Sequence, residues 1–182
     1  MAANDDTADL TYPGGELDLE IVHATQGSDG FALGPLLSKT GYTTFDPGFV
    51  NTASTKSAIT YIDGDAGILR YRGYPIEQLA EKSTFIEVSY LLIYGELPTA
   101  EQLATFTRHI QRHTMLHEDL RRFFDGFPRN AHPMPVLSSA VNALSAYYQD
   151  SLDPMDKKQV ELSTIRLLAK LPTIAAYAYK KS

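Results

Sequence analysis

Before Pro75, apolar and polar residues alternate in short runs that are separated by turn residues. The run Leu17-Asp18-Leu19-Glu20-Ile21 has the period of a half-buried strand, and Pro13-Gly14-Gly15 separates it from Leu10-Thr11-Tyr12. Residues 59–62 and 68–71 are two further apolar runs on either side of a glycine-bearing loop. Because short loops with glycine join antiparallel strands, this pattern predicts two β-hairpins.

After Pro75, apolar residues recur at spacings of three and four, which is the period of amphipathic helices. Thr84 and Thr99 precede Glu87 and Gln102 by three residues, and this spacing is a capping box at a helix start. The pattern therefore predicts consecutive helices, with apolar stripes at Leu103, Phe106 and Ile110, at Leu116, Leu120, Phe123, Phe124 and Phe127, at Leu137, Val141, Leu144 and Tyr148, and at Val160, Ile165 and Leu168.

The last predicted helix contains Pro172, which lacks an amide hydrogen, so we expect a kink or an end there. The following residues, 173–179, are apolar and still helix-like, and neither a glycine cap nor a polar tail follows them. A helix this apolar needs cover from other structure. We therefore expect the chain to continue in a longer protein.

The fold class predicted from these patterns is mainly α with a small N-terminal β region. Residues 1–74 form the β-hairpin and loop region. Residues 75–182 form the first part of a large helical domain that is truncated at its C-terminus. A length of 182 residues fits one domain or part of a larger one.

Composition and charge exclude several classes of protein. The chain has no Cys, which rules out disulfides, a thiol nucleophile and thiolate metal sites. With 16 Lys and Arg against 22 Asp and Glu, the net charge is −6, which argues against nucleic acid or an anionic membrane as partner. The start of the chain is acidic and has neither a secretory nor a mitochondrial targeting pattern. These features predict a soluble, cytoplasmic protein.

Positive charge gathers in one segment, which holds five of the eight Arg residues and four of the five His residues: Arg108, Arg112, Arg121, Arg122, Arg129, His109, His113, His117 and His132. In an acidic protein such a segment can bind an anionic small molecule, or it can simply be a solvated helix face. The same alternatives apply to Arg166 and Lys170, which are four apart and share a helix face. Together these two cations could clamp a phosphate.

His109, His113 and His117 are four residues apart and would share a face of one continuous helix, as zinc ligands do. Thr114 is a natural cap residue at which that helix can break, and the neighbouring Arg side chains disfavour a cation. We therefore assign no metal site. The common nucleophile-elbow, dinucleotide and phosphate-loop motifs are also absent from the sequence.

An ordered set of short strings resembles the bacterial citrate synthases of the hexameric type. The strings are Phe45-Asp46-Pro47-Gly48-Phe49, Thr52-Ala53-Ser54, Ile62-Asp63-Gly64-Asp65-Ala66-Gly67-Ile68-Leu69, Arg72-Gly73-Tyr74-Pro75-Ile76, Gln78-Leu79-Ala80, Gly95-Glu96-Leu97-Pro98-Thr99, Arg112-His113-Thr114-Met115, Asp150-Ser151-Leu152-Asp153 and Arg166-Leu167-Leu168-Ala169-Lys170-Leu171-Pro172-Thr173.

The resemblance implies a citrate-synthase-like helical domain and an acyltransferase that makes citrate and CoA from acetyl-CoA, oxaloacetate and water, the first step of the tricarboxylic acid cycle. In that family an Asp and two His residues act on the substrates, but the motifs that carry them do not occur in this sequence. We therefore assign no catalytic and no cofactor-binding residue. We expect this chain alone to be inactive, and the complete enzyme to self-associate into dimers and hexamers.

One site of the family does map onto this chain. Some hexameric members are inhibited by NADH at a site whose pattern matches Arg112, His113, Thr114, Met115, Tyr148, Arg166 and Lys170. The cations would bind phosphate groups and Tyr148 would stack or donate its hydroxyl. The alternative for residues 112–115 is a helix junction at a subunit contact. Three other readings stay open for the whole chain: a 2-methylcitrate synthase, a non-catalytic helical binding module and a His-rich metal protein.

Overall fold

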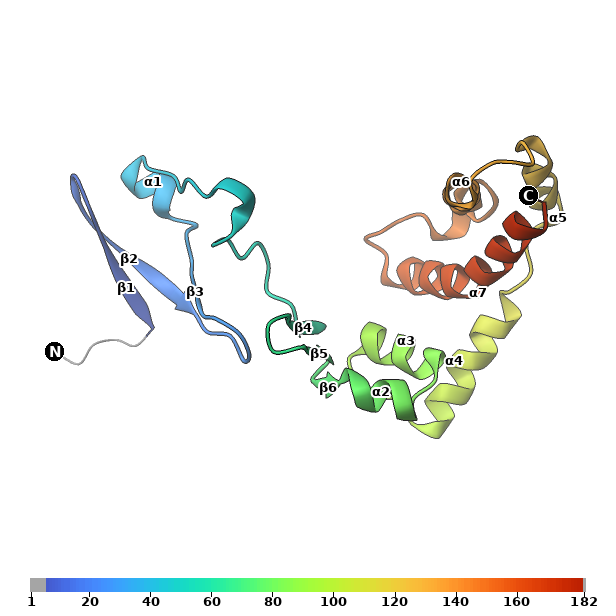
Figure 1. The fold of residues 1–182 in the computed structure, drawn as a ribbon, viewed down its shortest axis with the longest axis horizontal. Helices are drawn as coiled ribbons and strands as arrows, with labels where there is room; N and C mark the ends of the chain where they lie inside the picture. Colours follow the sequence, from blue (N-terminus) through green and yellow to red (C-terminus); the bar gives the residue numbers. More distant parts are fainter. Residues whose placement is uncertain (1–5, 182) are drawn as a thin grey trace. The chain divides into compact units, whose positions relative to one another are not determined.

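A computed structural model describes residues 6–181, without the side chain of Lys181 (Figure 1). The chain divides into two compact units, residues up to Glu96 and residues from Leu97 onward. The change from strands to helices comes earlier, because the last strand ends at Pro75 and a helix starts at Ile76. Ser182, the final residue of the predicted helical region, lies outside the described residues.

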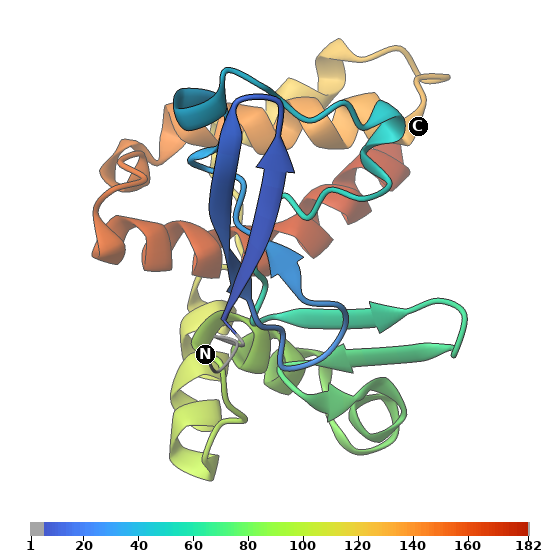
Figure 2. The same ribbon diagram turned by 90° about the vertical axis from the view of Figure 1, so that its left-hand side faces the viewer.

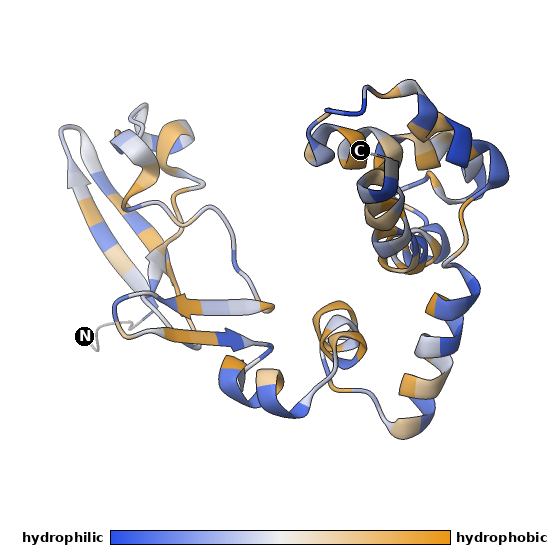
Figure 3. Cartoon of the chain, turned by 45° about the vertical axis from the view of Figure 1, so that its right-hand side comes forward, coloured by the Kyte–Doolittle hydropathy of each residue, from blue (hydrophilic) through white to orange (hydrophobic). Residues whose placement is uncertain are grey.

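The first unit begins with a hairpin of β1 (Thr7–Tyr12) and β2 (Gly15–Val22), to which the short β3 (Gly30–Phe31) is added. Leu10 pairs with Leu17 in this register, so both side chains lie on one face. That face is covered by Leu36 of α1 (Leu36–Thr40), while the opposite face is polar. Orange and blue bands therefore alternate along the two long strands in Figure 3, which confirms the first predicted hairpin.

The second predicted hairpin is also confirmed. Strand β4 (Thr60–Asp63) pairs with β5 (Ile68–Tyr71), and β6 (Tyr74–Pro75) adds a third strand (Figure 2). The chain then enters α2 (Ile76–Lys82) and α3 (Phe85–Tyr94).

The side chain of Arg72 joins this sheet region to α3. Its Nη1 donates to the Ala58 carbonyl at 3.2 Å, and its Nη2 donates to the Leu92 carbonyl at 2.8 Å. The second bond satisfies a carbonyl in the last turn of α3, where helical partners run out. Arg72 thus helps to end that helix.

Both capping boxes form as predicted. At α3 the Thr84 side chain accepts from the Glu87 amide, and the Glu87 carboxylate accepts from the Thr84 amide at 2.6 Å. The Thr84 hydroxyl also donates to this carboxylate, at 2.7 Å. The two hydrogen bonds from the Thr84 amide and hydroxyl to the carboxylate lower the pKa of Glu87 below its ordinary value. Gly95 ends α3 with a φ of 94°, a conformation that favours glycine. Thr99 and Gln102 start α4 (Ala100–Arg112) in the same way.

The second unit contains α4, α5 (Glu118–Phe123), α6 (Pro133–Tyr147) and α7 (Lys157–Lys181). Its core consists of Leu116, Leu120, Phe124, Val136, Ala140, Leu144, Ile174 and Ala178. Full burial of a side chain such as Leu120 stabilises the fold by roughly 2 kcal/mol, so this core supplies most of the packing energy of the unit.

Of the kink or end expected at Pro172, the structure excludes the end, because α7 continues to Lys181. The proline lies inside the helix, between the buried side chains of Ala169 and Ile174. Packing on both sides of Pro172 offsets the loss of one helical hydrogen bond. Tertiary contacts therefore override the local preference.

Candidate functional site

The seven residues of the expected anion site come from three places in the second unit. Arg112 ends α4, and His113, Thr114 and Met115 form the turn that follows it. Tyr148 is the C-cap of α6, and Arg166 and Lys170 lie one turn apart on α7. The structure brings the 113–115 turn, Tyr148 and the two α7 cations together, whereas the side chain of Arg112 is exposed.

Lys170 is the buried centre of this cluster, with only 2% of its surface exposed. Its Nζ donates to the carbonyl oxygens of His113 at 2.7 Å and Met115 at 2.5 Å. The ammonium also lies 4.8 Å from the centroid of the Tyr148 ring, whose π face attracts a cation. Two carbonyls and a ring thus replace the water that burial removes.

Thr173, one turn further along α7, completes the attachment of the turn. Its hydroxyl donates to the Thr114 carbonyl at 3.0 Å. Three successive carbonyls, those of residues 113–115, therefore accept hydrogen bonds from side chains of a single helix. These groups follow the end of α4 and have no helical partners of their own, so α7 fixes the path of the chain between α4 and α5.

Arg166 is held by groups from the end of α6. Its Nη1 and Nη2 donate to the two carboxylate oxygens of Asp150 at 2.5 and 2.9 Å, and Nη1 also donates to the Ser151 hydroxyl at 2.9 Å. The guanidinium lies 4.6 Å from the Tyr148 ring centroid. This pair is bidentate, the strongest geometry for an arginine and a carboxylate. It lowers the pKa of Asp150 and raises the pKa of Arg166.

The local sequence explains how these groups reach Arg166. Helix α6 stops at Tyr147, and Tyr148 leaves helical geometry with φ −127° and ψ 63°. A single 3₁₀ turn, Gln149–Ser151, then directs Asp150 and Ser151 back toward α7. The Ser163 hydroxyl donates to the Ser151 carbonyl at 2.6 Å and fixes the turn to the same helix.

The imidazole of His113 is half-buried beside this charge. Its pKa is lowered from the ordinary value of 6.5, first by burial and then by the positive charges of Arg166 and Lys170, with a smaller contribution from His109. Burial and the two cations therefore favour the neutral ring over the charged ring, relative to a histidine in water. A neutral imidazole can accept as well as donate a hydrogen bond, so it adds a polar contact rather than a third positive charge.

Sequence reasoning did not assign Asp150, Ser151 or Thr173 to the site. Asp150 and Ser151 belong to one of the quoted strings, and their closeness to Tyr148 along the chain was the available signal. Of the two alternatives for Lys170, a solvated helix face and a phosphate clamp, the solvated face is wrong, because only 2% of the residue is exposed. Its hydrogen bonds go to backbone carbonyls, so in this structure it positions the turn.

The histidines of the basic segment do not share one helix. His109 lies on α4, His113 is its C-cap, and His117 is the N-cap of α5, where its Nδ1 accepts from the Asp119 amide at 3.2 Å. The His117 ring also packs on Tyr147, with centroids 4.9 Å apart. Within residues 6–181, no three His, Cys, Asp or Glu side chains gather in a way that could hold a metal ion.

Most of the arginines in the basic segment face solvent, as a solvated helix face predicts, and the exposed ones are Arg108, Arg112, Arg122 and Arg129. Arg121 is half-buried, pairs with Glu118 at 3.2 Å and lies 5.7 Å from the Tyr177 ring centroid. An anion site within the described chain is therefore better supported on α7 than along this segment.

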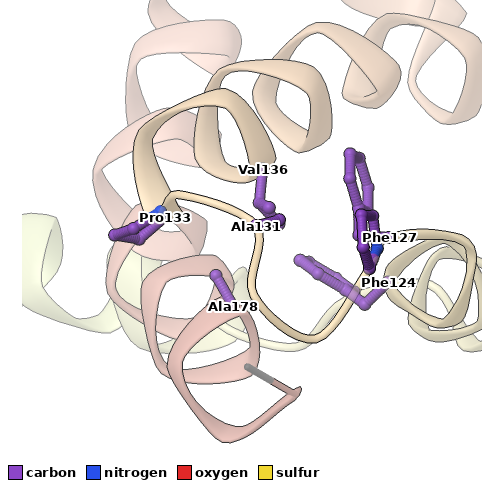
Figure 4. A pocket seen from close by; sticks show the side chains of 7 residues that line it. Phe124, Phe127, Ala131, Pro133, Val136 and Ala178 are labelled. Carbon is purple, nitrogen blue, oxygen red and sulfur yellow. The ribbon is translucent and has the colours of Figure 1, made fainter.

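A small hollow lies among the 124–131 segment, α6 and α7 (Figure 4). Its lining is Phe124, Phe127, Pro128, Ala131, Pro133, Val136 and Ala178. The lining carries no ionisable side chain, so this hollow offers no acid–base or charge chemistry.

Among the described helices, none combines the length and the apolar character that a membrane crossing requires.

Comparison with known proteins gives three consistent similarities. Residues 48–182 match the family model described as "Citrate synthase, C-terminal domain". The chain is 84% identical over all 182 residues to "Citrate synthase 1" of Mycobacterium tuberculosis, and covers 42% of that protein. It is 57% identical over 180 residues to "Citrate synthase" of Corynebacterium glutamicum. That match covers 99% of this chain and 41% of that protein.

A solved structure shows the same similarity in three dimensions. The crystal structure of citrate synthase from Pyrobaculum aerophilum superposes with a TM-score of 0.66 at 31% sequence identity. The match covers 96% of this chain and 39% of the other. The chain thus spans about two fifths of the length of the curated relatives it matches.

Replacing Lys170 with Met tests its positioning role. The substitution leaves the His113 and Met115 carbonyls without their donor, and we expect the free energy of unfolding to fall by about 2 kcal/mol. Lys158→Met, an exposed position on the same helix, should change it by less than about 0.5 kcal/mol. Urea unfolding of the two variants measures both values, and equal stabilities would contradict the role.

The pKa of His113 gives a prediction about pH. Because the folded chain lowers this pKa, the stability contribution is complete above about pH 6.5 and is lost as the pH falls through the folded value. An NMR titration of the His113 ring should therefore give a midpoint below 6.5, and Lys170→Met should move it upward. A midpoint at or above 6.5 in the unsubstituted protein would show that burial and the two cations do not act on this ring.

Proposed function

The chain belongs to the citrate synthase family, and we propose that the protein of natural length that contains it condenses acetyl-CoA, oxaloacetate and water to citrate and CoA. The observation that carries this proposal is the 84% identity to a protein named citrate synthase 1 along the whole of this chain. Identity at that level, without interruption in either unit, leaves the relatives' framework in place. The reaction would be the entry step of the tricarboxylic acid cycle in the cytoplasm.

The role proposed for residues 1–182 is to build the framework of such an enzyme. The sequence lacks the motifs that carry the family's catalytic residues, so none of its side chains is assigned a step in the reaction. The chain spans 42% of the M. tuberculosis relative, which leaves room in a protein of that length for those motifs. Exposed apolar side chains such as Phe45 (93%) and Val50 (83%) suit contacts with further structure or with a second subunit.

We propose further that the cluster around Tyr148 takes NADH as an inhibitor. Support comes from the assembly of a tyrosine ring, a bidentate arginine and a half-buried imidazole in one place. Arg166 would contact a phosphate of the dinucleotide, and the exposed Arg112 and Met115 would line the approach. Lys170 would act by holding the 113–115 turn and by adding its charge.

Measurement of thiol release tests the enzymatic proposal. Recombinant protein of natural length, given acetyl-CoA and oxaloacetate, should release CoA and form citrate. Residues 1–182 alone should give no release above background. Propionyl-CoA should react more slowly in the same assay, and a faster reaction would favour a 2-methylcitrate synthase. Activity of the isolated 182-residue chain would contradict the framework role.

Replacement of Arg166 with Gln tests the NADH proposal in the natural-length enzyme. The variant loses a charged hydrogen bond to phosphate, so the NADH concentration that halves activity should rise about tenfold. Arg129→Gln removes an exposed arginine outside the cluster and should leave that concentration unchanged. The NADH site is excluded if Arg166→Gln responds to NADH like the parent enzyme.

A further inference from the structure

The two residues of the Arg166–Asp150 ion pair differ in their exposure to solvent. Only 12% of the Arg166 side chain is exposed, whereas 61% of the Asp150 side chain is exposed. Arg166 also donates to the Ser151 hydroxyl and lies over the Tyr148 ring, so it has contacts that do not depend on the Asp150 carboxylate. The carboxylate sits on a single 3₁₀ turn, Gln149–Ser151, and most of it is exposed to solvent.

The carboxylate presents two oxygen atoms to two guanidinium nitrogens. A phosphoryl group binds arginine through the same arrangement of two oxygens and two N–H donors. Asp150 therefore occupies the position that a phosphoryl group of a ligand would need. An anion can bind Arg166 in this geometry only after the Asp150 carboxylate has left.

The charges around the Arg166 guanidinium favour an incoming anion once Asp150 has moved. Lys170 lies beside the same ring, and within residues 6–181 its hydrogen bonds go to the neutral carbonyls of His113 and Met115. The His113 ring lies beside these cations at the C-cap of α4, where burial and their charge lower its pKa. A ligand with more than one negative charge thus gains from both Arg166 and Lys170, whereas Asp150 brings a single charge.

We propose that Asp150 is a built-in competitor that fills the anion seat on Arg166, and that a phosphoryl group binds there by displacing it. This inference rests on the anion site proposed above and names the residue that sets its affinity. Asp150 is a specificity-determining residue in this account, because it rejects ligands that cannot present two anionic oxygens to the arginine. It takes no part in the reaction itself.

The test compares binding of inorganic pyrophosphate and NADH to the natural-length protein and to Asp150→Asn by isothermal titration calorimetry at low ionic strength. Removal of the competing charge should tighten pyrophosphate binding about fivefold. Glu118→Gln is the matched control, because Glu118 pairs with a different arginine, Arg121, in the same unit. It should leave pyrophosphate binding unchanged, as should Asp150→Glu, which keeps the charge.

The outcomes separate this inference from the NADH proposal. If pyrophosphate binds the parent and Asp150→Asn equally, or if Arg166→Gln does not abolish the gain, the competitor is excluded while an anion site stands. If Asp150→Asn gains affinity for pyrophosphate and neither protein binds NADH, the competitor role of Asp150 is confirmed and the proposal that the site binds NADH is wrong. If no anion binds either protein, both proposals fail. Neutral adenosine should bind both proteins equally, which shows that the gain depends on charge.

Discussion

The buried ammonium of Lys170 is the interaction on which the arrangement of the helical unit depends. A cation with 2% exposure is stable only where polar groups replace its water, and here the His113 and Met115 carbonyls do so. These carbonyls belong to the turn between α4 and α5, so one side chain of α7 fixes how three helices meet. Apolar packing around Leu120 and Ile174 supplies more energy, but it does not specify this turn.

Because Lys170 is bound to the turn, the residues of the candidate site have different roles. Lys170 donates to backbone carbonyls, and the Tyr148 ring lies beside both cations. Arg166 pairs with Asp150, whose side chain is largely exposed to solvent. Two cations on one helix thus flank one ring, and a single carboxylate that is largely exposed pairs with one of them. That combination suits regulation by an anionic ligand, and it is separate from the framework role that similarity to citrate synthases supports for the whole chain.

Local features of the fold could be predicted from sequence because their causes lie within a few residues. The Leu10–Leu17 pairing follows from alternation and a glycine turn, and Thr84 with Glu87 forms a complete capping box. Pro172 shows where such reasoning fails, since burial of Ala169 and Ile174 keeps the helix intact. Charge and helical spacing pointed to the basic segment and to the Arg166–Lys170 pair, but the site as a set could be collected only by resemblance, and its contacts span up to 59 positions. No periodicity indicates that Lys170 bonds the 113–115 turn or that Asp150 returns to Arg166.

If Asp150 is an exchangeable competitor, the contacts of Lys170 stay fixed while the carboxylate on Arg166 gives way to an anion. Crystal structures of the natural-length protein with and without pyrophosphate would reveal both. The Lys170 Nζ should keep its two carbonyl contacts in the two structures, and Asp150 should leave Arg166 where the anion is bound. This competitor role would be contradicted by a Lys170 that turns away from the His113 and Met115 carbonyls to bind the anion while Asp150 stays in place.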